Sequence, residues 1–70
     1  MEEKVFYVIK EIHDENTPYV LEFGIMNSCR TNNKDVATAY PTYKEALKRA
    51  DDLGYKEEDI LIEEITKIIK

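Results

Sequence analysis

The chain has 70 residues, of which 15 are Asp or Glu and 10 are Lys or Arg, so its formal net charge is −5. A domain of this length buries only about 60% of the surface that its unfolded chain exposes. It can therefore build one small core, but neither a second domain nor a deep substrate cleft. We expect a single domain over residues 1–70 that has no enzymatic activity.

The cysteine content and the N-terminal sequence favour the cytoplasm. Cys29 is the only cysteine, whereas small secreted domains are usually stabilised by several disulfides. Residues 1–4 are acidic, and no continuous apolar run follows them as it would in a secretory signal. The longest apolar stretches fall far short of the roughly 20 residues that cross a bilayer. We expect a cytoplasmic protein that does not span a membrane.

The first third of the sequence predicts an antiparallel hairpin. Residues 4–12 are rich in β-branched and aromatic side chains, which favours a strand. The polar segment 13–18 contains Asp14, Asn16 and Pro18 and is typical of a turn. A second strand is predicted by apolar residues at alternate positions, namely Tyr19, Leu21, Phe23 and Ile25.

The middle of the chain predicts a loop and a short strand. Residues 27–35 show no apolar periodicity and include Asn32 and Asn33, so we expect an exposed loop there. Residues 36–40 contain Val36, Thr38 and Tyr40, which are residue types that favour strands. We therefore expect the third strand over residues 36–40.

A helix is predicted over residues 43–53. Thr42 is followed three residues later by Glu45, a spacing in which the hydroxyl and the carboxylate each satisfy a free backbone N–H at a helix start. Gly54 can adopt the left-handed conformation that closes a helix. Between them, apolar residues recur three or four apart, as on one helical face: Tyr43, Ala46, Leu47, Ala50 and Leu53.

The last segment, residues 59–70, is compatible with a strand or a helix. Ile60 and Ile62 alternate as in a strand. Other apolar residues also fit one face of a helix, namely Leu61, Ile65, Ile68 and Ile69. We favour a strand over 59–66, because three consecutive apolar residues after a helix end are typical of a buried central strand. The order β-β-β-α-β then predicts an α+β fold, with one helix packed on a small antiparallel or mixed sheet of three to four strands.

No set of residues supports catalysis, a metal site or a cofactor. His13 and Cys29 are the only residues of their kinds, so one chain cannot assemble a metal site from His and Cys. Gly24 and Gly54 are isolated, whereas a phosphate-binding loop needs several closely spaced glycines. The chain has aromatic residues on which bases could stack, but it lacks the basic groove that the binding of single-stranded nucleic acid also requires. We expect no catalytic residue, no metal, no cofactor and no direct binding of nucleic acid.

The distribution of acidic residues is the most informative feature of the sequence. Residues 51–64 hold seven carboxylates against one lysine, and residues 1–15 carry a smaller acidic excess. Carboxylates on one face of a strand or helix stand about 5–7 Å apart, so a row of them can imitate nucleic-acid phosphates. The competing interpretation is that charge of one sign merely keeps a small protein soluble. The candidate partner-binding residues are Asp51, Asp52, Glu57, Glu58, Asp59, Glu63, Glu64, Glu11, Asp14 and Glu15.

In size, acidity and lack of a catalytic set, the chain resembles the small, early-expressed host-takeover proteins of bacteriophages. The resemblance is of general character and depends on the acidic residues between Asp51 and Glu64, together with Glu11, Asp14 and Glu15. Some proteins of this kind are acidic DNA mimics that occupy the DNA-binding face of a nucleoid protein such as HU. The resemblance implies an inhibitor that binds a basic DNA-binding protein in the cytoplasm of a bacterial host.

A second hypothesis belongs to another class of function. The chain could be a scaffolding or antitoxin-like interaction module that binds through apolar surface and sheet edges, and such binding would persist in high salt. A core of this size rarely provides more than about 3–5 kcal/mol. Ile65, Ile68 and Ile69 could leave an apolar strip exposed, so we also expect a possible homodimer.

Overall fold

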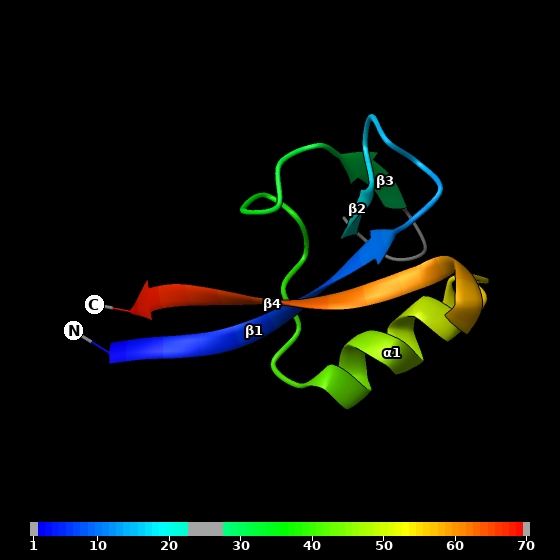
Figure 1. The fold of residues 1–70 in the computed structure, drawn as a ribbon. Helices are drawn as coiled ribbons and strands as arrows, with labels where there is room; N and C mark the ends of the chain where they lie inside the picture. The colour runs from blue at the N-terminus through cyan, green and yellow to red at the C-terminus, as the bar shows by residue number, and fades with distance from the viewer. Residues whose placement is uncertain (1, 23–27, 70) are drawn as a thin grey trace.

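The computed structural model describes residues 2–22 and 28–69. These residues form one four-stranded antiparallel sheet in the order β3-β2-β1-β4, with a helix packed on it (Figure 1), which confirms the predicted α+β class. The elements are β1 (Glu2–Glu11), β2 (Tyr19–Glu22), β3 (Ser28–Thr31), α1 (Tyr43–Asp52), the short 3-10 helix η1 (Glu57–Asp59) and β4 (Ile60–Ile69).

The central strand of the sheet is β1. It pairs with β4 along its whole length, from Glu2 opposite Ile69 to Glu11 opposite Ile60. The C-terminal segment is therefore a strand, as favoured, but the prediction that it is a buried central strand is wrong. It forms an edge of the sheet, and Leu61 in the middle of its apolar run is half-exposed. Ile60 and Ile62 pack against the buried residues on the helix side of the sheet, whereas Leu61 points to the other face and joins neither buried cluster of the described residues.

The predicted hairpin is confirmed where the structure describes it. The strands β1 and β2 are antiparallel, with Lys10 opposite Tyr19, and the turn between them contains the predicted polar residues. Phe23 and Ile25 of the predicted second strand lie outside the described residues. The hairpin is short because β1 and β2 share only this one register pair before they diverge.

The third strand lies in a different segment from the one predicted. Residues 28–31, expected in a loop, form β3 and pair with β2, whereas residues 36–40 are not a strand. That segment bonds the sheet at two points. The backbone N–H of Thr38 donates to the carbonyl of Val20, and Tyr40 forms an isolated bridge with Tyr7. It fills the space where β1 and β2 diverge, so its apolar residues pack without forming a ladder.

The predicted helix is confirmed, and both of its ends follow local chemistry. Thr42 is the N-cap residue and its hydroxyl accepts the backbone N–H of Glu45 at 3.1 Å. Gly54 follows the helix with a φ of 90°, a conformation that costs glycine little. Ala46 and Ala50 face the sheet and are buried, whereas Tyr43 is exposed.

The core consists of two buried clusters on opposite faces of the sheet. On the helix side, Ile9 and Val20 pack against the two buried alanines of α1. On the other side, Val8 and Ile65 pack against Ala37 from the segment that precedes the helix. Ile65 is therefore a core residue, so the predicted apolar strip at the C-terminus loses one of its three members.

The ribbon formed by β1 and β4 extends past α1 toward the two chain ends (Figure 1). Its outer half, residues 2–5 with residues 66–69, carries exposed apolar side chains, among them Val5 and Ile68. Within the described part of the chain, no helix is long and apolar enough to cross a membrane.

Candidate functional site

The last turn of α1 and the short helix η1 bring five of the ten predicted carboxylates to one end of the molecule. This end lies opposite the chain termini (Figure 1). Gly54 reverses the chain after α1, and the backbone N–H of Tyr55 donates to the carbonyl of Ala50 at 3.0 Å, which holds the following residues beside the helix end. We call this surface the acidic end. Its members are Asp51, Asp52, Glu57, Glu58 and Asp59.

The carboxylates of the acidic end are weakly neutralised. In the described residues their one ion pair with a lysine or arginine joins Lys48 Nζ and Asp52 Oδ2 at 4.0 Å, and both side chains are well exposed. Exposed pairs of this kind contribute about 0–1 kcal/mol. Asp59 lies 3.0 Å from His13 Nε2 in the β1–β2 turn, so the acidic end also touches the turn that holds Glu15. Most of its negative charge therefore faces solvent.

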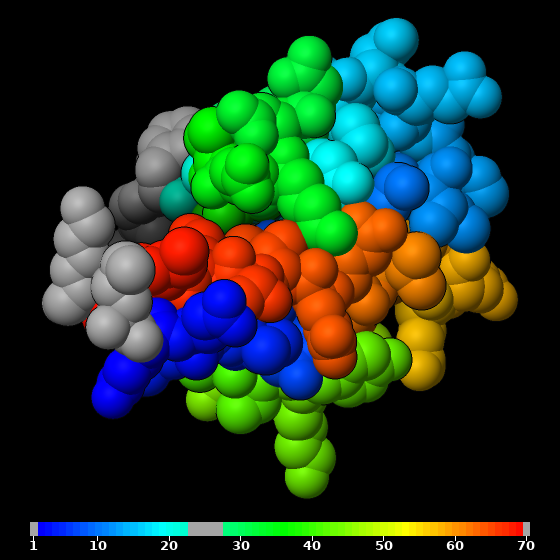
Figure 2. Space-filling model, turned by 60° about the vertical axis from the view of Figure 1, so that its left-hand side comes forward, coloured from blue at the N-terminus to red at the C-terminus, as the bar shows by residue number. Residues whose placement is uncertain are grey.

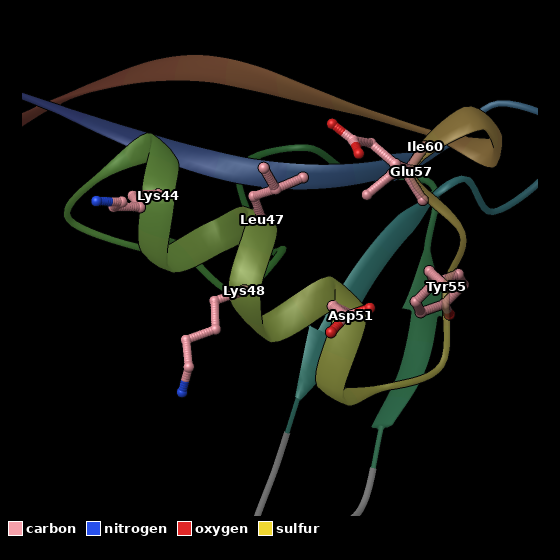
Figure 3. Close-up of a pocket in the computed structure, with 7 residues that line it drawn as sticks. All are labelled: Lys44, Leu47, Lys48, Asp51, Tyr55, Glu57 and Ile60. Atoms are coloured by element: carbon pink, nitrogen blue, oxygen red, sulfur yellow. The ribbon is translucent and has the colours of Figure 1, made fainter.

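An apolar hollow of about 410 Å³ opens beside the acidic end. Its apolar lining comes from Leu47, Tyr55 and Ile60, and carboxylates from both elements of the acidic end stand at its rim (Figure 3). In this view the side chains of Lys44 and Lys48 point away from η1. The hollow thus joins an apolar floor to a rim that carries two carboxylates and two lysines. The rim residues are Lys44, Lys48, Asp51 and Glu57.

Glu11 and Asp14 are not available as a row of negative charge, because both bind Arg30. The Nη1 atom of Arg30 lies 3.2 Å from Glu11 Oε2 and 3.1 Å from Asp14 Oδ2. Glu11 is also buried, with 8% of its surface exposed. The backbone N–H of Thr17 donates to Asp14, which lowers the pKa of that carboxyl, with further hydrogen bonds acting in the same direction. These two carboxylates therefore stabilise the turn.

Glu63 and Glu64 do not form a row with the acidic end either. They are consecutive in a strand and therefore project to opposite faces of the sheet. Glu63 accepts a hydrogen bond from the Tyr19 hydroxyl at 3.0 Å and lies 3.4 Å from the Nζ atom of Lys34. Only Glu64 of this pair is exposed. The structure thus places the carboxylates of residues 51–59 on two neighbouring elements, with Asp51 and Glu57 beside one hollow, and separates them from those of residues 11, 14, 63 and 64.

A further charged network was missed by sequence reasoning. Glu22 accepts a hydrogen bond from the Nε atom of Arg49 at 2.7 Å and another from the Tyr40 hydroxyl. Burial, with added effects from Glu22, raises the pKa of the Tyr40 hydroxyl. The three residues lie on separate elements, and no local spacing links them. The network joins α1 to β2, which makes it a structural feature rather than a binding surface.

Other chemistry finds little support in the described residues. No group of three or more His, Cys, Asp and Glu side chains is arranged there to hold a metal ion. Cys29 is a free, exposed thiol on β3. Comparisons of the chain with protein-family models, with curated proteins and with solved structures find no match. A functional hypothesis therefore has to be built from the acidic end and the surfaces of the sheet.

Proposed function

We propose that the chain is a non-enzymatic binding protein that imitates DNA and blocks the basic DNA-binding surface of another protein. The observation that carries the proposal is the acidic end, where carboxylates from α1 and η1 converge with a single exposed lysine pair. A nucleoid protein of the HU type is the partner that the resemblance to phage proteins suggests. The partner-binding residues are narrowed from ten to the five of the acidic end, with Glu15 beside them.

The placement of Asp51 and Asp52 supports a role in binding. Both lie in the last two positions of α1, where the helix dipole presents partial negative charge. A carboxylate in this position destabilises a surface helix by about 0.3–1 kcal/mol. The two adjacent carboxylates are therefore unfavourable for the isolated fold. A positively charged partner would attract these same carboxylates.

A DNA-binding partner offers the positive charge that such a negative surface can bind. A DNA-binding protein presents lysine and arginine side chains that grip phosphates, and its affinity for DNA depends steeply on salt. A compact negative surface competes for those side chains and steers association over long range. The hollow beside Asp51 and Glu57 adds apolar contact for the stem of a lysine or arginine whose charged head reaches the rim. Binding would therefore be stoichiometric, without turnover.

A pair of matched charge reversals tests the proposal. Glu57→Lys with Glu58→Lys changes two exposed residues of the acidic end, and Glu2→Lys with Glu3→Lys changes two exposed residues near the opposite end. Both variants alter the net charge equally. We expect the first to weaken binding to an immobilised HU-type protein by roughly tenfold or more, and the second to change it far less. Displacement of duplex DNA from the same protein provides the functional readout.

Salt provides an independent test. Exposed charge pairs are screened over about 8–10 Å at moderate ionic strength, so the complex should weaken steeply between low and moderate salt. Equal losses from both double variants would show that only net charge matters. Binding that is insensitive to salt, or unaffected by Glu57→Lys with Glu58→Lys, would show that the acidic end is not the binding surface.

The second candidate function is an interaction module that binds through apolar surface and a sheet edge. It is favoured by a different observation, the exposed apolar residues Leu61, Ile68 and Ile69 on the edge strand β4. A scaffolding or antitoxin-like partner recognised there would remain bound in high salt. Truncating Ile68 to Ala would weaken such a complex and leave an acidic-end complex unchanged.

A further inference from the structure

In the described residues, one side of β4 carries backbone groups that no other strand satisfies. Tyr7 donates its N–H to the carbonyl of Tyr40 and accepts the N–H of Tyr40, both at 2.8 Å, so its backbone groups point away from β4. By the alternation of an antiparallel ladder, the neighbouring residues Phe6 and Val8 then bond to β4. Their partners in β4 are Ile65 and Glu63. The residues that direct N–H and C=O groups to the open side are therefore Ile62, Glu64, Thr66 and Ile68.

This open edge is long and regular, and no strand formed by residues 2–22 or 28–69 pairs with it. The register between β1 and β4 runs without interruption over ten residues, and β4 contains no proline. Figure 2 shows β4, in orange and red, crossing the exposed face between the segment that precedes α1 and the start of β1. Natural proteins usually blunt such edges with bulges, prolines, covering loops or charged side chains, and of these β4 has only the charges of Glu63, Glu64 and Lys67. An edge of this kind is a template for another strand.

We propose that β4 pairs antiparallel with β4 of a second copy of this chain, so that one sheet continues across a twofold axis at Ile65. Each of the four outward residues then opposes an outward residue of the partner. Ile62 faces Ile68, and Glu64 faces Thr66, once on each side of the axis. Each of these pairs exchanges two N–H···O bonds. The backbone groups left open in one chain are satisfied by the second.

The side chains select this register. On the helix side of the sheet it sets Ile62 against Ile68, and on the other side it sets Leu61 against Ile69. It also sets Glu63 against Lys67, so opposite charges meet across the interface. Leu61, Ile68 and Ile69, which are exposed in the single chain, all gain apolar partners. No charged side chain in the paired segment stands directly opposite a charge of its own sign.

Several other pairings of the open edges oppose like charges. Moving the axis to Glu64 opposes two copies of that carboxylate, and moving it to Lys67 opposes two lysines. The open edge of β1 is shorter, since the bridge between Tyr7 and Tyr40 closes the rest of it. Self-pairing of β1 around Lys4 or Glu3 would also oppose like charges. The edge of β4 is therefore the surface at which a second copy fits.

Two proline variants provide a matched test. Val5 and Thr66 are direct partners in the ribbon, and the backbone groups of both point away from it, Val5 to the β1 edge and Thr66 to the β4 edge. Proline at either position removes an N–H that the single chain does not use. We expect the wild-type chain and Val5→Pro to have the mass of two chains at high micromolar concentration in analytical ultracentrifugation. Thr66→Pro should have the mass of one chain while retaining its circular dichroism spectrum.

Disulfide cross-linking tests the register even if a proline variant unfolds. In a Cys29→Ser background, Glu64→Cys with Thr66→Cys places two thiol pairs across the proposed axis, at a Cα separation of about 5.5 Å that a disulfide can span. We expect this double variant to form a covalent dimer under mild oxidation and Glu64→Cys alone to form none. A wild-type mass of one chain, or cross-linking by Glu64→Cys alone, would overturn the proposal. Salt-resistant dimerisation leaves the acidic-end proposal untouched, so the two can fail separately.

Discussion

The two ends of the ribbon formed by β1 and β4 differ in what their surfaces offer. Near η1 the ribbon is covered by α1 on one face, and its surroundings carry the five carboxylates of the acidic end. Near the chain termini the ribbon extends past the helix and exposes Val5, Ile68 and Ile69 (Figure 1). One end therefore offers charge on a packed support, and the other offers backbone groups and apolar side chains.

Along this one pair of strands, the half beside α1 stabilises the fold and the half near the chain ends is exposed for binding. Residues Val8 and Ile9 are fully buried, whereas Val5, four positions before Ile9, is 46% exposed. A small domain has little stability to spare, since one core of this size provides only about 3–5 kcal/mol. The inner half of the ribbon, residues 6–11 with residues 60–65, has to supply most of this stability. The outer half is then free to serve an interface.

The largest expected effect comes from truncating the inner half. Ile9→Ala removes a fully buried side chain that packs against α1, and should destabilise the fold by about 2–5 kcal/mol. Val5→Ala, in the outer half, should cost about 0.5–1 kcal/mol. Urea denaturation of both variants checks the contrast. Similar losses for the two would mean that the outer half contributes to the core as much as the inner half does.

An intermediate effect is expected from the network that ties α1 to β2. Glu22→Gln removes the charge that Arg49 Nε and the Tyr40 hydroxyl contact, and should cost about 1–2 kcal/mol, given that Arg49 is partly exposed. It should also lower the pKa of Tyr40 toward its usual value of 10.0, because one cause of the raised value is lost. Ultraviolet titration of the tyrosines measures that change.

The same network predicts a loss of stability in alkali. The pKa of Tyr40 is raised above 10.0 in the folded chain, so its contribution to stability is complete below that pH and is lost as the pH rises through the folded value. We expect the midpoint of urea denaturation to fall above about pH 10 in the wild type. In Tyr40→Phe this part of the fall should disappear. An unchanged alkaline profile would exclude Tyr40 as its source.

The smallest effect should have the opposite sign. Asp51→Asn removes a carboxylate from the negative end of the helix dipole, so it should stabilise the fold by about 0.3–1 kcal/mol, or raise Tm by roughly 1–8 °C. Glu45→Gln, in the first turn of the same helix, is the control and should lower Tm. Asp51→Asn should also weaken partner binding. A variant that loses stability would remove the argument that this residue is kept for recognition.

The parts of the fold that local chemistry determines could be predicted from the sequence. The hydroxyl of Thr42 and the conformation of Gly54 set the two ends of α1, and the polar residues after β1 set the hairpin turn. The third strand could not be located in this way. Residues 28–31 lack apolar periodicity and become β3 only because β2 lies beside them, whereas the apolar residues near Ala37 are used for the core. Contacts between residues distant in sequence therefore determine both the position of β3 and the role of the segment near Ala37.

The candidate site could be predicted only in part, for the same reason. The carboxylates of residues 51–59 stay together because a short chain reversal separates α1 from η1. Cations distant in sequence, Arg30 and Lys34, pair with Glu11, Asp14 and Glu63. Nothing in the spacing of these residues indicates that they would meet. The alternation of a strand separates Glu63 from Glu64, although both are among the candidates that the sequence analysis assigned to one binding surface.

The central claim is that the acidic end is the surface that meets a basic partner. The most direct measurement is a nuclear magnetic resonance titration, in which an isotope-labelled chain is mixed with an HU-type protein and the backbone amide shifts are followed. We predict that the amides of residues 51–59 shift first and furthest, with those beside Asp59 in the β1–β2 turn, and that added salt reverses the change. Shifts concentrated along β4, or spread evenly over the sheet, would contradict the claim.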